Sequence, residues 1–65
     1  MRTLSDVHRA LNTKLGKEDI VRLVTTRVFL RTGVNLRQIR QEQDADQKVV
    51  ASVISALDGM GYSLS

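Results

Sequence analysis

The sequence predicts an all-α protein, a small bundle of four to five short helices. Apolar residues recur at helical spacing along nearly the whole chain and show no clear alternation with a period of two. The chain has no proline, and its four glycines fall at or after the ends of the apolar stretches, where helices end. At 65 residues the chain is expected to form a single helical domain over residues 1–65, with a small core.

The first helix is expected over residues 4–15. One apolar stripe runs along it, made of Leu4, Val7, Leu11 and Leu15. Ser5 is of a residue type that caps helix N-termini, and we expect it to cap this helix. Gly16 follows the last apolar residue and can take the positive φ with which many helices end.

The second helical stretch covers residues 17–32, as one helix or as two. Its expected core stripe consists of Ile20, Leu23, Val24 and Val28. Phe29 does not belong to this stripe, because on a continuous helix it falls among polar residues. Either the helix breaks near residues 24–26 or Phe29 faces a partner.

The segment from Arg31 to Arg40 predicts the turn and second helix of a helix-turn-helix. Gly33 can take the positive φ that the turn needs, and Asn35 is a good N-cap for a short recognition helix over residues 35–41. Ile39 would hold this helix against the core. The polar residues of the segment are types that hydrogen-bond phosphates and base edges.

The last helix is expected over residues 46–58, capped by Asp44 or Asp46. Its apolar stripe consists of Val49, Val50, Val53, Ile54 and Leu57. A second face carries Ala51, Ser55 and Gly59 at a spacing of four residues, so another helix could approach closely there. Together with Phe29, these small residues are the candidate dimer contact.

Residues 62–65 are expected to form a short strand or a frayed end.

Composition narrows the kinds of site that the chain can hold. It has no cysteine and one histidine, so a disulfide framework is excluded, and neither a metal site nor a cofactor is expected. No apolar run approaches the roughly 20 residues of a membrane span, and no signal peptide is recognisable, so we expect a cytoplasmic chain without a membrane partner. So small a core favours self-association, and a homodimer is expected.

Positive charge is concentrated in the first two thirds of the chain. Residues 1–41 carry nine Lys or Arg against three acids, whereas residues 42–65 carry one Lys against four acids. Seven of the ten cations are arginines, which suit bidentate contacts to phosphate and guanine. The pattern is typical of either a nucleic-acid partner or a solvated basic face.

Residues 23–40, with the sequence LVTTRVFLRTGVNLRQIR, resemble the helix-turn-helix of the lambda-repressor/Cro type. The distance from Gly33 to the closing helix over residues 49–60, which contains the segment SALDGMG, is also similar to that family. This resemblance covers about residues 17–65 and implies a compact DNA-binding domain that acts as a repressor. Residues 31–40 also resemble the recognition helix of the mercury-resistance-regulator (MerR) family, which ranks second.

The first functional hypothesis is therefore a small, dimeric, sequence-specific DNA-binding transcriptional regulator. Its recognition helix would enter the major groove of double-stranded DNA. The candidates for base-edge contacts are Asn35, Arg37, Gln38 and Gln41. The candidates for phosphate contacts are Lys17, Arg27, Arg31 and Arg40.

The alternative hypothesis is an all-helical protein-interaction module, such as an antiactivator, an adaptor or a phage-type inhibitor. It would bind a protein partner through an exposed apolar or basic face. The position of Phe29 separates the two hypotheses, since a surface Phe29 on one long helix favours the interaction module. An enzyme is not expected, because the sequence contains no recognisable nucleophile–base pair and no phosphate-binding glycine loop.

Overall fold

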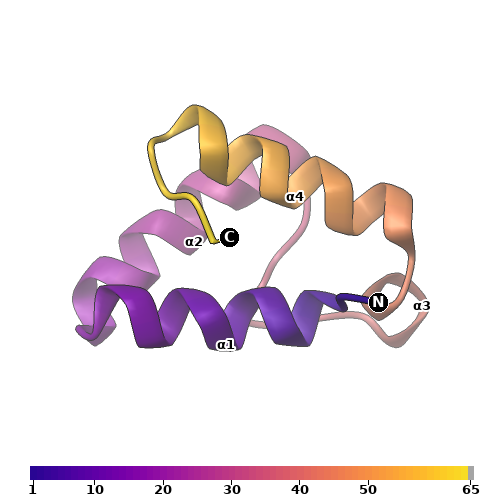
Figure 1. Cartoon of the computed structure of the whole chain (residues 1–65), viewed down its shortest axis with the longest axis horizontal. Helices are drawn as coiled ribbons and strands as arrows, with labels where there is room; N and C mark the ends of the chain where they lie inside the picture. Colours follow the sequence, from indigo (N-terminus) through magenta and orange to yellow (C-terminus); the bar gives the residue numbers. More distant parts are fainter. Residues whose placement is uncertain (65) are drawn as a thin grey trace.

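The computed structural model describes residues 1–64, which form an all-α fold of four helices (Figure 1). They are α1 (Leu4–Leu15), α2 (Glu18–Thr32), the short α3 (Gln41–Asp44) and α4 (Gln47–Gly59). No strand occurs among the described residues, so the tail is not extended into a sheet over 62–64, and Ser65 lies outside them. The all-α prediction is confirmed.

A capping box at Thr3 begins α1. The Thr3 hydroxyl oxygen accepts the Asp6 backbone N–H at 3.1 Å, and the Asp6 carboxylate accepts the Thr3 backbone N–H at 3.0 Å. These bonds lower the pKa of the Asp6 carboxyl group below its usual value. The expectation that Ser5 caps the helix is wrong, because Ser5 lies inside the first turn. Its backbone N–H and its hydroxyl both donate to the Asp44 carboxylate, each at 2.9 Å, which ties α1 to α3.

A single unbroken helix, α2, covers the stretch that the sequence left open as one helix or two. It ends at Gly33, which has a φ of 75° and donates its backbone N–H to the Phe29 carbonyl oxygen at 2.8 Å. The buried residues of α2 are Val21, Val24, Thr25 and Val28. Ile20 and Leu23, expected in the core, are instead 39% and 53% exposed, because α1 and α4 pack against the other side of the helix.

The cap of α4 is Asp46, whose carboxylate accepts the backbone N–H groups of Lys48 at 3.0 Å and Val49 at 3.5 Å. Asp44, the other candidate for this cap, bonds to Ser5 instead. The assignment follows from geometry, because only Asp46 directly precedes the first helical residue, Gln47.

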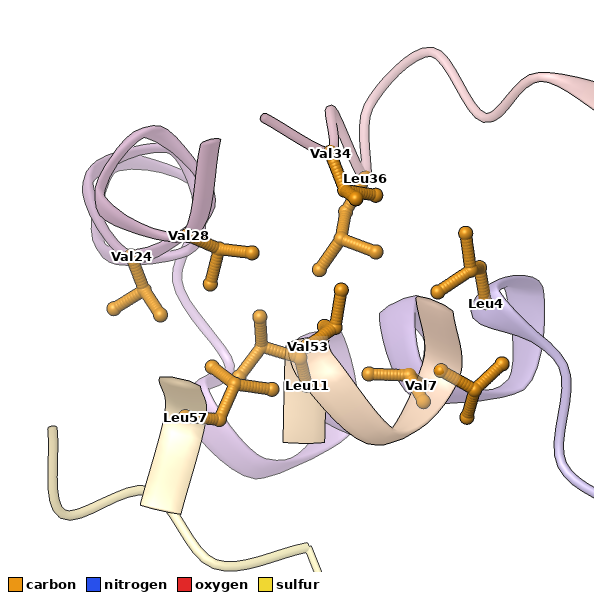
Figure 2. Close-up of a cluster of buried hydrophobic side chains, with 10 residues drawn as sticks. Leu4, Val7, Leu11, Val24, Val28, Val34, Leu36, Val53 and Leu57 are labelled. Carbon is orange, nitrogen blue, oxygen red and sulfur yellow. The ribbon is translucent and has the colours of Figure 1, made fainter. Parts of the chain in front are cut away.

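Leucine and valine alone make up the buried core cluster, and no aromatic side chain belongs to it. Figure 2 shows side chains from α1, α2, α4 and the segment after α2 converging on one interior. The members are Leu4, Val7, Leu11, Val24, Val28, Val34, Leu36, Val50, Val53 and Leu57. Close packing of these side chains is the main stabilising contribution to the fold, because the chain has no disulfide to assist it.

Candidate functional site

The recognition helix expected over residues 35–41 is not formed. Residues 34–40 are a loop with a turn at Asn35–Gln38, and α3 begins only at Gln41. The Asn35 side chain accepts the Arg37 backbone N–H at 2.9 Å, and the Asn35 carbonyl oxygen accepts the Gln38 backbone N–H at 3.1 Å. Asn35 therefore starts a local turn of the kind that competes with a helix, rather than capping one.

Two buried side chains anchor this loop to the core. Val34 and Leu36 are 5% and 1% exposed, while Asn35 between them is exposed. Figure 2 shows both apolar side chains entering the core from the loop. The loop is thus held against the core on both sides of Asn35, and the turn that Asn35 starts takes the place of the expected helix.

The predicted DNA-contacting residues are all exposed, but they lie on four different parts of the chain. Lys17 precedes α2, Arg27 and Arg31 lie on α2, and Gln41 begins α3. The remaining four are on the loop: Asn35, Arg37, Gln38 and Arg40. No single helix among the described residues presents the set that was expected to read bases.

Two of the predicted phosphate-binding arginines contact other parts of the chain. Arg40 forms a surface ion pair with Glu42 at 2.8 Å. Arg31 lies over Gly59, where a Cβ atom would be 3.5 Å from the Arg31 Nη1 atom. A cation near the C-terminus of α4 is favourable because the last carbonyl groups of a helix are electronegative. Gly59, predicted as a dimer contact, is thus partly covered by Arg31.

Arg37 lines two neighbouring hollows on the surface. The smaller, of about 90 Å³, is also lined by Thr25, Thr26, Phe29 and Asn35. The larger, of about 370 Å³, lies between α1 and α2 and is also lined by His8, Asn12, Glu18, Val21 and Arg22. Of the predicted DNA-contacting residues, only Asn35 and Arg37 are brought together in these hollows.

His8, which lines the larger hollow, has a lowered pKa. Burial lowers the pKa of the imidazole below its usual value, and the positive charge of Arg37 lowers it further. His8 is therefore neutral at pH 7 and can both donate and accept a hydrogen bond. Sequence reasoning missed this hollow, because nothing in the local pattern shows that residues 8 and 12 lie beside residue 37.

A second exposed feature is apolar and belongs to α2. Ile20, Leu23 and Leu30 are 39%, 53% and 76% exposed. Together with Arg27 they recur at spacings of three, four and three residues, so they share one side of the helix, here called the outer face of α2. This spacing is visible in the sequence, but two of the residues had been assigned to the core.

The predicted dimer contacts lie on two helices, α2 and α4. Phe29 is 47% exposed and borders the smaller hollow beside Asn35 and Arg37. Ala51 and Ser55 are exposed on α4. A dimer contact through these residues stays a prediction.

No family model, curated protein or solved structure matches the chain. None of the helices within residues 1–64 is long and apolar enough to cross a membrane. The chemistry of the two surface features, the outer face of α2 and the Arg37 hollows, is therefore the basis for assigning a function.

Proposed function

We propose that this chain is a small protein-interaction module that binds a partner protein through the outer face of α2. The observation that carries the proposal is the exposure of Ile20, Leu23 and Leu30 on one side of a helix whose opposite side fills the core. A helix that is apolar on two sides is stable between two layers of protein, and this chain provides one of them.

The exposure of Phe29 also favours a protein-interaction module over a DNA-binding regulator. It is an exposed side chain on one continuous helix, which is the arrangement that favours this alternative. A helix-turn-helix would need a second helix directly after Gly33, and residues 34–40 are a loop there.

The outer face of α2 has the chemistry of a docking site for a helix. Side chains spaced three and four residues apart form the seam by which two helices pack side by side. Arg27, between Leu23 and Leu30, would lie in the middle of that seam and favours an acidic residue on the partner. The partner is thus an apolar helix with an acidic residue opposite Arg27, from another protein or from a second copy of this chain.

A photo-crosslinking residue at position 23 tests this proposal in the native host. We expect it to attach to one specific protein, while the same residue at Ser52, exposed on α4, does not. With the purified pair, Leu23→Glu should weaken binding about tenfold or more, because a buried anchor is replaced by a charge. Helical circular dichroism should stay unchanged. Equal attachment at both positions, or unchanged affinity of Leu23→Glu, would contradict the proposal.

Double-stranded DNA is the second candidate partner, supported by cations without a counter-charge. Lys17, Arg27, Arg31 and Arg37 form no ion pair within the described part of the chain. Their contacts would be to phosphates, which give affinity and strong salt dependence but little sequence discrimination.

Fluorescence anisotropy against DNA from upstream of the chain's own gene, at two salt concentrations, separates the two candidates. The interaction-module proposal predicts weak binding that scrambled competitor DNA removes. Tight binding that survives the competitor and is lost in Arg37→Ala would instead favour a DNA-binding regulator.

A further inference from the structure

We propose that the Arg37 hollows form a binding site for the phosphate group of a small phosphate monoester. The site lies between α1, α2 and the loop after α2, away from the outer face of α2 that binds the protein partner. It does not depend on the proposed function, because it uses different side chains.

The larger hollow gathers hydrogen-bond donors from three separate parts of the chain. Arg37 comes from the loop, Arg22 from α2, and His8 and Asn12 from α1. A volume of about 370 Å³ suits a small molecule rather than a chain segment. Two guanidinium groups offer planar pairs of N–H donors that match the oxygens of a phosphate group.

Arg37 is free to bind an anion. It forms no ion pair within residues 1–64, although its charge is strong enough to lower the pKa of His8. The Asn12 amide is held in place, because its nitrogen donates to the His8 carbonyl oxygen at 3.0 Å. The positive potential and the fixed amide are thus present before any ligand binds.

One acid opposes the arginines in this hollow. The Glu18 carboxylate accepts from Arg22 at 3.5 Å, and both side chains are largely exposed, so the pair is weak. A phosphate group that carries nearly two negative charges at pH 7.5 would displace Glu18 from Arg22. Removing the Glu18 charge is therefore expected to strengthen binding.

The smaller hollow offers a contact for an organic group attached to the phosphate. It adjoins the larger one at Arg37 and is bordered by the exposed Phe29 ring, with Thr25 and Thr26 beside it. An apolar group attached to the phosphate would contact this ring while the phosphate contacts Arg37.

Titration with phenyl phosphate, followed by NMR at constant ionic strength and pH 7.5, tests the site. We expect saturable shifts of the backbone amides around Asn12 and Arg37. A separate pH titration of the His8 imidazole, with and without phenyl phosphate, should show a higher pKa in its presence, because the phosphate neutralises the charge of Arg37. Dimethyl phosphate, a diester with a single charge, should bind about fivefold more weakly or worse. A preference for the diester would overturn the assignment and point to a nucleic-acid backbone.

Three variants test whether phenyl phosphate binds at the Arg37 hollows. Arg37→Gln should weaken binding about tenfold or more and Glu18→Gln should strengthen it about two- to fivefold. Arg27→Gln makes the same change in net charge on the outer face of α2 and should alter binding less than about twofold. Equal losses in Arg37→Gln and Arg27→Gln, or no saturable shifts, would overturn the proposal. Neither result would affect the crosslinking test at position 23.

Discussion

Replacing Leu36 with alanine is expected to lower the free energy of unfolding by about 2–5 kcal/mol. Leu36 is 1% exposed and lies in the core although it belongs to a loop. Truncation would remove buried methyl groups and leave a cavity among well-packed side chains. A domain of this size has about 3–10 kcal/mol of stability in total, so the substitution would remove a large fraction of it.

Urea unfolding followed by circular dichroism measures this loss, with Gln38→Ala as the control. Gln38 lies in the same turn but is exposed, so its truncation should change stability by less than about 0.5 kcal/mol. A stability loss in Gln38→Ala equal to that in Leu36→Ala would contradict the buried position of Leu36 and the exposed position of Gln38.

The elements that could be predicted from the sequence are those with one clear apolar stripe. The helix over Leu4–Leu15 was expected over the same residues, and α4 begins and ends within one residue of the expected range. In both helices, apolar residues occupy one side and polar residues the other, so pattern alone determines which side is buried.

The rotation of α2 could not be predicted because apolar residues occur around most of its circumference. Val24 and Val28, expected in the core, are buried, but Val21 and Thr25 take the places expected for Ile20 and Leu23, and the spacing fits either pair beside Val24 and Val28. Contact with α1 and α4 decides the outcome, and that contact is tertiary. The exposed set then becomes the surface on which the proposed function rests.

The loop after α2 was missed for a local reason. Asn35 can cap a helix or close a turn with the same side-chain oxygen, so its presence before Leu36 fits both outcomes. Val34 and Leu36 alternate with Asn35 over only three residues, which is too short a run to distinguish a buried loop from a helix. The Arg37 hollows depend on this loop, and they could not be anticipated without it.

The second prediction compares one substitution at two leucines. Leu57→Ala should lower the free energy of unfolding by about 2–5 kcal/mol, because Leu57 is fully buried in the core. Leu30→Ala should change it by less than about 0.5 kcal/mol in dilute solution, because Leu30 is 76% exposed. Both residues lie on long helices, so helix propensity changes equally and burial accounts for the difference.

Urea unfolding of both variants at two protein concentrations also tests whether a second copy of the chain covers the outer face of α2. Anything that binds only the folded chain raises its apparent free energy of unfolding, and this gain grows with the logarithm of the concentration once binding is saturated. If Leu30→Ala destabilises the protein more at high concentration than at low, the outer face of α2 is covered by a second copy of the chain. If its small effect is the same at both concentrations, the face is free in the isolated protein, and its partner is a different protein. Equal losses for Leu30→Ala and Leu57→Ala in dilute solution would contradict the exposed position of Leu30, and with it the outer face of α2.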